Sequence, residues 1–178
     1  AILIQMSTLT IVLGFLSLPL IVAYPLMKRY TYWPQAFLGL TFNFGALMGW
    51  SAVTGSLGLP ALMLYLSGIF WTLCYDTIYA HQDTEDDALV GIKSTALLFG
   101  KTSKYWVSAF AVISWLLLVA AFFMGGGTLI SGIVLLAALG LLKFQIYQWQ
   151  PASPESSLRI FKAARNYGLV VLLAALFS

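Results

Sequence analysis

The sequence has 178 residues, of which 61% are hydrophobic and only 8% are charged, against roughly 25% charged residues in an average soluble domain. Its mean hydropathy is +0.91 and its net charge is +3. A soluble domain needs a polar surface, and a disordered chain needs low hydrophobicity, so both classes are excluded. The composition indicates an integral membrane protein whose partner is the lipid bilayer, and we expect no nucleic-acid partner.

About 20 apolar residues are needed for a helix to cross a bilayer. The apolar stretches are long and do not alternate with polar residues, which favours helices over a barrel. We therefore expect an all-α, polytopic transmembrane helical bundle forming a single domain over residues 1–178. Six spans are predicted, at about 7–27, 34–53, 59–81, 104–124, 128–147 and 161–177.

The start of the chain indicates an N-terminally truncated fragment. It has no initiator Met, and the apolar residues 1–4 are typical of the end of an earlier helix. We therefore expect further helices to precede this segment in the complete protein.

Charge is distributed unevenly between the two predicted membrane faces. The basic residues follow the first span, lie in the loop after the third and flank the loop after the fifth, whereas the opposite loops, near 54–58 and 125–127, carry no charge. By the positive-inside rule the charged face is cytoplasmic and the C-terminus points outward. All six acidic residues also lie on the charged face, so we expect the chemistry there.

An acidic cluster follows the third span. If that helix continues beyond the apolar run, Asp76, Tyr79, Asp83 and Asp87 fall within one stripe at about 100° per residue. Three carboxylates on one face repel each other unless a cation or protons neutralise them. Mg²⁺ suits such a site, because it binds one or two carboxylates together with substrate phosphates. Asp76 is hardest to explain otherwise, since an ionisable residue at membrane depth is expensive, and Asp83 and Asp87 are functional candidates with it. A solvated acidic loop is the alternative, chiefly for Glu85 and Asp86.

A basic cluster follows the first span. Tyr24 and Lys28 are four residues apart and share a helix face, and Arg29 is adjacent. One interpretation is a membrane anchor made of basic and aromatic residues. The other is a diphosphate held between Mg²⁺ and these cationic donors. Composition and spacing leave both interpretations open.

Two segments carry a family resemblance. Residues 24–39 read YPLMKRYTYWPQAFLG, and residues 71–100 contain YDTIYAHQDTEDD followed by GIKSTALLFG. Together they resemble the UbiA family of membrane prenyltransferases, and within it the members that prenylate 4-hydroxybenzoate. The combined pattern YDxxYAxxDxxxD and GIKSTAxxFG is specific, and the resemblance extends along the whole chain.

The resemblance implies a nine-helix fold with two aspartate-rich motifs, of which this chain has the last six helices and the second motif. The first motif, NDxxDxxxD, is absent. The implied activity is Mg²⁺-dependent transfer of a polyprenyl group from polyprenyl diphosphate to the ring of 4-hydroxybenzoate in ubiquinone biosynthesis. The implied location is a bacterial or mitochondrial inner membrane, with the site facing the cytoplasm or matrix. The missing N-terminal helices of the same enzyme are expected as partners, and the chain alone is expected to be inactive.

The resemblance also implies roles for individual residues. Asp83 and Asp87 match positions that hold Mg²⁺ on the diphosphate, and Asp76 is an additional ligand or a proton acceptor. The diphosphate itself is contacted by residues from the first segment, which are Tyr24, Lys28 and, as a weaker candidate, Arg29.

Three other functions fit the composition. One is a UbiA-family prenyltransferase for another aromatic acceptor, and another is an inactive fragment or non-catalytic membrane subunit. The third is a cation or proton transporter with Asp76 in its pathway. Transporter sites often lie near the membrane midplane, whereas the charges here lie on one face.

Overall fold

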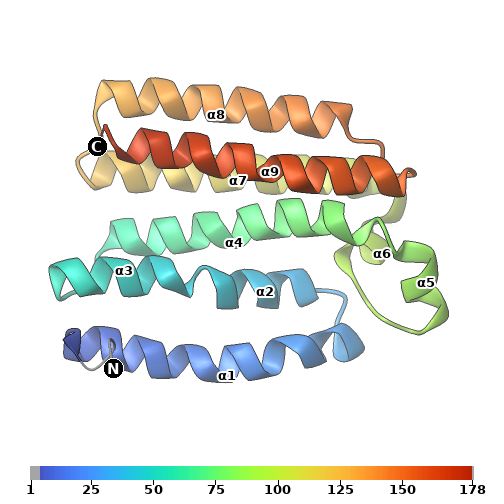
Figure 1. The fold of residues 1–178 in the computed structure, drawn as a ribbon, viewed down its shortest axis with the longest axis horizontal. Helices are drawn as coiled ribbons and strands as arrows, with labels where there is room; N and C mark the ends of the chain where they lie inside the picture. The colour runs from blue at the N-terminus through green and yellow to red at the C-terminus, as the bar shows by residue number, and fades with distance from the viewer. Residues whose placement is uncertain (1–4, 178) are drawn as a thin grey trace.

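The computed structural model describes residues 5–177, and every regular element in that range is a helix (Figure 1). The prediction of an all-α bundle is confirmed. In chain order the elements are α1 (Thr8–Tyr30), α2 (Pro34–Phe42), α3 (Phe44–Thr54), α4 (Leu59–Ala80), α5 (Thr84–Leu89), α6 (Thr95–Phe99), the short 3₁₀ turn η2 (Gly100–Thr102), α7 (Ser103–Met124), α8 (Leu129–Gln148) and α9 (Pro154–Ala175).

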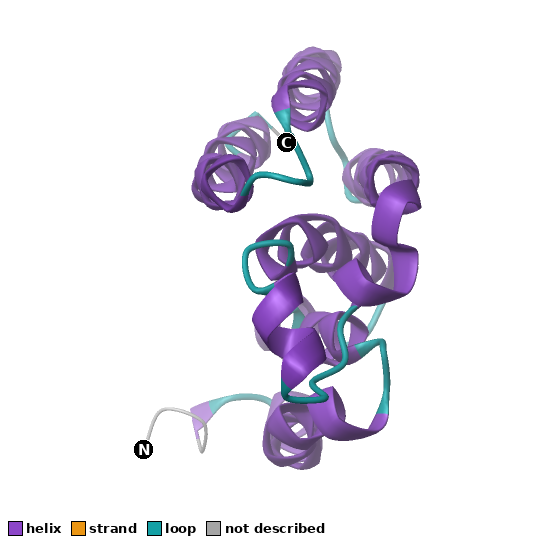
Figure 2. Ribbon diagram, turned by 90° about the vertical axis from the view of Figure 1, so that its right-hand side faces the viewer, coloured by secondary structure: helices purple, strands orange, loops and turns teal. Residues whose placement is uncertain are grey.

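Helix α4 lies at the centre of the bundle. It packs most extensively against α7 and also contacts α2, α3 and α9, whereas α1 packs on α2 and α3 and α8 packs on α9 and α7. The end-on view shows α7, α8 and α9 on one side of α4 and the α1–α3 layer on the other (Figure 2). The short helices α5 and α6 form a cap at one end, beyond the end of α4 (Figure 1). Helix α4 therefore separates the α1–α3 layer from the α7–α9 layer, and its side chains contact both.

Five of the helical segments are long and apolar enough to cross a membrane: Thr8–Tyr30, Pro34–Thr54, Leu59–Ala80, Thr95–Met124 and Leu129–Gln148. They correspond to the first five predicted spans, although the fourth segment begins at Thr95 rather than near residue 104 because it includes α6 and η2. Helix α9 is not among them, and it begins at Pro154 rather than near residue 161. The Ser153 hydroxyl caps this earlier start by accepting a hydrogen bond from Ser156 N at 3.1 Å. The extra turns carry charged residues, which lower the hydropathy of the helix.

The second predicted span is broken in the middle, which the sequence pattern did not predict. Asn43 separates α2 from α3, and its amide nitrogen donates to the Gly39 carbonyl at 2.8 Å and to Thr72 Oγ1 at 2.9 Å. A side chain that bonds to its own helix backbone competes with the helical ladder. The bond to Thr72 then attaches the break to α4.

This break requires a glycine on α4. A Cβ atom added to Gly68 would overlap with the Asn43 side-chain amide. Gly68→Ala is therefore expected to destabilise the fold by about 1–3 kcal/mol, the usual cost of overpacking. Thermal unfolding in detergent micelles measures the effect. Gly45→Ala is the matched control, because no atom lies within 4 Å of the added Cβ. Equal unfolding midpoints for the two variants would contradict the close approach.

The acidic stripe is not one continuous helix, so that part of the prediction is wrong. Helix α4 ends at Ala80 and α5 begins at Thr84. His81 is buried, and its ring packs edge-on against Trp149 with centroids 5.0 Å apart. The break also places the acidic residues at 85–87 in the first turn of α5, where the helix dipole favours negative charge. The helix thus ends where His81 packs against Trp149, the residue that follows α8.

Candidate functional site

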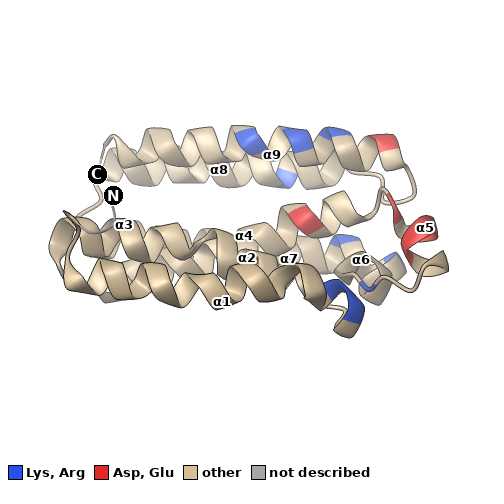
Figure 3. Ribbon diagram, turned by 60° about the horizontal axis from the view of Figure 1, so that its bottom comes forward, with Lys and Arg blue, Asp and Glu red and all other residues tan. Residues whose placement is uncertain are grey.

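The charged residues gather toward the α5 end of the bundle (Figure 3). A cavity of about 110 Å³ opens there, between the end of α1, the end of α4 and the loops around α5. Its lining combines carboxylates, cations and a tyrosine pair: Tyr24, Lys28, Gln35, Asp76, Tyr79, Ala80, Asp83, Asp87, Ile92, Lys93 and Ser94. We call it the acidic cavity.

The acidic cavity brings together most of the predicted site residues. Tyr24 and Lys28 reach it from α1, Asp76 from α4, Asp83 from the turn and Asp87 from α5. The three carboxylates line the same cavity although the helix is broken between Asp76 and Asp87. The basic and acidic clusters, about 50 residues apart in sequence, are therefore neighbours in space.

Arg29 is the exception among the predicted residues. Its side chain is exposed and does not line the acidic cavity. It follows Lys28 directly, and successive residues of a helix point in directions about 100° apart. Only one of the two cations therefore faces the carboxylates.

The structure adds site residues that the sequence analysis did not single out. Gln35 is buried at the start of α2, and its Oε1 accepts a hydrogen bond from Thr95 N at 3.1 Å. Lys93 donates from its backbone to the Lys28 carbonyl at 2.9 Å and from Nζ to the Tyr30 carbonyl at 3.3 Å. The loop before α6 is thereby attached to the end of α1. Lys93 lies in the quoted GIKST run, so that motif was the available signal.

Lys28 is the electrostatic link between the two clusters. Its ammonium interacts with the carboxylates of both Asp76 and Asp87. Burial is the largest cause that raises the pKa of Asp87 above its ordinary value, and the Lys28 charge opposes this rise. The nearby carboxylates of Asp83 and Asp86 raise the pKa further. A cation placed between these groups would favour their ionised forms.

The carboxylates of the acidic cavity suit Mg²⁺ if the ion is held together with a bound phosphate. Mg²⁺ prefers oxygen ligands and is usually held by one or two carboxylates together with substrate phosphates and water. Asp76, Asp83 and Asp87 supply carboxylate oxygens around one cavity. Within residues 5–177, however, no three Asp, Glu, His or Cys side chains come close enough together to hold a metal ion. The arrangement therefore suits an ion shared with a bound phosphate rather than an all-protein cage.

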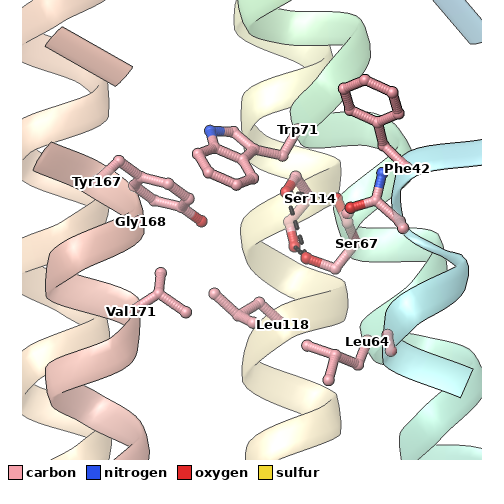
Figure 4. A pocket seen from close by; sticks show the side chains of 12 residues that line it. Phe42, Leu64, Ser67, Trp71, Ser114, Leu118, Tyr167, Gly168 and Val171 are labelled. Carbon is pink, nitrogen blue, oxygen red and sulfur yellow. Dashed lines mark hydrogen bonds between the residues drawn. The ribbon is translucent and has the colours of Figure 1, made fainter. Parts of the chain in front are cut away.

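A second, largely apolar cavity of about 300 Å³ lies deeper in the bundle, between the α2–α3 break, α4, α7 and α9 (Figure 4). Its wall includes Leu64, Leu118 and Val171. On its floor Ser67 and Ser114 donate their hydroxyls to each other's carbonyls, at 2.8 and 2.9 Å. These two serines satisfy each other, whereas the Tyr167 hydroxyl in the same lining has no hydrogen-bond partner among the described residues. The rest of the lining is mainly carbon.

Comparisons with known proteins agree with this architecture. A profile of the UbiA prenyltransferase family matches residues 1–170. The chain is 52% identical over 168 residues to the mitochondrial 4-hydroxybenzoate polyprenyltransferase of Bos taurus, covering 92% of this chain and 44% of that protein. The protein of the same name from Arabidopsis thaliana is 60% identical over 115 residues, covering 64% of this chain and 28% of that protein. The chain thus spans less than half the length of these curated relatives.

A solved structure shares the fold. The apo structure of a UbiA homologue from Aeropyrum pernix K1 superposes with a TM-score of 0.74, covering 95% of this chain and 65% of that one, at 22% sequence identity. At that identity the likeness concerns the fold alone. The match to the family profile, by contrast, extends over nearly the whole sequence. The chain belongs to the UbiA prenyltransferase family.

Proposed function

We propose that this chain forms the second half of a Mg²⁺-dependent enzyme that transfers a polyprenyl group from polyprenyl diphosphate to the ring of 4-hydroxybenzoate, in ubiquinone biosynthesis. The observation that carries the proposal is the acidic cavity, where the carboxylates Asp76, Asp83 and Asp87 meet Lys28 and Tyr24. The names of the similar curated proteins support the choice of acceptor.

The residues of the acidic cavity suit the departure of a diphosphate. Asp83 and Asp87 are proposed to hold Mg²⁺, which when bound supplies positive charge for the leaving group. Asp76 is proposed as an additional ligand or as a proton acceptor. Lys28 and Tyr24 are proposed to donate hydrogen bonds to the diphosphate oxygens. Charge-assisted donors stabilise negative charge most where it develops in the transition state.

The proposed reaction balances without any further reagent. The bond between the allylic carbon and the diphosphate oxygen breaks, and the diphosphate leaves with the electron pair. The allylic carbon then bonds to the ring carbon ortho to the phenol hydroxyl. That carbon loses its proton to a base, for which Asp76 is the candidate if it is not a ligand, and the ring becomes aromatic again.

The apolar cavity between α4, α7 and α9 is proposed to receive the isoprenoid chain. It includes Trp71 of α4, the helix that also carries Asp76, and it is lined mainly by carbon. A dry environment protects an allylic cation from water. We also propose that the charged end faces the cytoplasm or the mitochondrial matrix, and that helices outside these residues complete the site with a second set of carboxylates.

An assay of the complete gene product tests the proposal. Membranes containing it are incubated with 4-hydroxybenzoate, a polyprenyl diphosphate and Mg²⁺, and prenylated product is measured by mass spectrometry. We expect product with Mg²⁺ and none with a chelator. Absence of product under both conditions would overturn the proposal, and product only from a different aromatic acceptor would reassign the substrate within the family.

A further inference from the structure

A third cavity, of about 290 Å³, lies between α4 and α9, and the proposed function does not assign it. We call it the α4–α9 cavity. Its lining is unusual for a membrane bundle because it combines aromatic rings with two cations: Trp71, Tyr75, Phe161, Lys162, Ala164 and Arg165. The volume is near the lower end of the range for small-molecule sites, roughly 300–1,000 Å³.

The aromatic walls of this cavity are in contact with one another. The ring centroids of Trp71 and Tyr75 are 5.3 Å apart and edge-on, and those of Tyr75 and Phe161 are 5.9 Å apart and tilted. Aromatic pairs prefer such offset or edge-to-face arrangements. A flat aromatic guest therefore has both faces and edges of neighbouring rings to contact.

The polar groups of the cavity favour an anion. Lys162 and Arg165 lie three residues apart on α9, at a spacing that places them on one helix face. The planar guanidinium of arginine matches a carboxylate through two parallel hydrogen bonds. In addition, the buried Trp71 Nε1 has no hydrogen-bond partner among the described residues. This nitrogen lies on the edge of the indole that is turned away from Ser67 and Ser114 (Figure 4).

The α4–α9 cavity adjoins the acidic cavity. Tyr79 lines the acidic cavity, and the centroid of its ring is 4.5 Å from that of Phe161, which lines the α4–α9 cavity. Trp71 also lines the deeper apolar cavity. The three cavities are therefore neighbours along α4, and the Tyr79–Phe161 ring contact lies between the acidic cavity and the α4–α9 cavity.

We propose that the α4–α9 cavity binds the aromatic acceptor as its carboxylate anion, with the ring among Trp71, Tyr75 and Phe161 and the carboxylate at Arg165 and Lys162. This inference rests on the proposed function and adds to it the residues that select an acidic acceptor. It places the acceptor ring beside the Tyr79–Phe161 contact, next to the compartment proposed for the diphosphate. Lys162 and Arg165 on α9 then recognise the acceptor, whereas Lys28 on α1 recognises the donor.

Equilibrium binding to the complete gene product is the first test, in nanodiscs made only of zwitterionic phosphatidylcholine. Radiolabelled 4-hydroxybenzoate is expected to bind the wild-type protein, and Arg165→Gln is expected to weaken binding about 10- to 100-fold, the usual worth of a charge-assisted hydrogen bond. Arg165→Lys should recover part of the affinity, because lysine restores the positive charge but not the two parallel hydrogen bonds of a guanidinium. Arg159→Gln is the matched control, since Arg159 is on the same helix but lines a different cavity.

Kinetics supply a readout that general damage to the fold would not mimic. Arg165→Gln is expected to raise the KM for 4-hydroxybenzoate by the same factor. The KM for polyprenyl diphosphate and the inhibition constant of the neutral analogue 4-hydroxybenzamide should stay unchanged. A specific loss of this kind separates recognition of the carboxylate from packing of the ring.

Several outcomes would overturn the inference. These are failure of the wild-type protein to bind 4-hydroxybenzoate, unchanged affinity in Arg165→Gln, and equal losses for the benzoate, the benzamide and the diphosphate. A defect that appears only when anionic lipid is added would show that α9 binds headgroup phosphates instead. If the wild-type protein binds 4-hydroxybenzoate in an Arg165-dependent way but forms no product with it, the inference stands and the proposed function fails.

Discussion

Asp83→Ala in the complete gene product is expected to lower prenyl transfer about 100-fold or more, while the protein still inserts into membranes in normal amount. Asp83 lines the acidic cavity from the turn between α4 and α5. In the proposed mechanism it holds Mg²⁺ on the leaving diphosphate. Removal of one group that stabilises transition-state charge commonly costs about 10²–10³ in rate. Turnover is measured at saturating substrate, and membrane abundance by immunoblot.

Asp86→Ala is the control for this prediction. Asp86 lies three residues further on, in the first turn of α5, and carries the same charge. Both side chains are exposed, but only Asp83 lines the acidic cavity. Its loss should leave turnover within about twofold of wild type, because its carboxylate does not line the cavity proposed to hold the ion. Equal defects in the two variants would mean that the net charge of α5 matters rather than a ligand at Asp83. Near-normal turnover of Asp83→Ala would remove the metal assignment.

Lys28→Ala is expected to raise the KM for polyprenyl diphosphate by at least about 10-fold, with little change in the KM for 4-hydroxybenzoate. Lys28 is the α1 cation that lines the acidic cavity, and its charge acts on both Asp76 and Asp87. Without it, the carboxylates lose a compensating charge and the diphosphate loses a donor. Initial rates at varied concentrations of each substrate separate the two effects.

Arg29→Ala provides the comparison on the same helix. It removes an identical formal charge from the next residue, whose side chain is exposed outside the acidic cavity. The KM for polyprenyl diphosphate should therefore remain close to wild type. A rise as large as that of Lys28→Ala would indicate a general attraction of anions to this end of the bundle. Equal changes in both KM values of Lys28→Ala would likewise argue against direct contact with the diphosphate.

The sequence predicted the positions of the long helices well, because each is marked by an apolar run of adjacent residues. The α1, α4, α7 and α8 helices lie within a few residues of the predicted spans, because the length of an apolar run and its flanking turns are properties of adjacent residues. The break at Asn43 was not predicted, since an isolated Asn in an apolar run carries no strong stop signal. It depends on a hydrogen bond to Thr72, which is distant in sequence.

For the candidate site, the sequence identified the residues but not their proximity. Tyr24, Lys28 and the three aspartates were identified as two clusters by spacing and motif, and the structure places them around one cavity. Their proximity could not be derived from either segment alone. It arises because the loop carrying Lys93 bonds to the end of α1 and Gln35 holds the start of α6.

The sequence by itself determined that this is a helical membrane protein with its charge at one end, and its motifs identified the family. These properties follow from composition and from residues close together along the chain. Only the tertiary structure decided that the acidic helix breaks at His81, that Lys28 rather than Arg29 faces the carboxylates, and that α9 presents cations beside α4. These features depend on packing between helices, and contacts between distant segments leave no periodic mark in either segment.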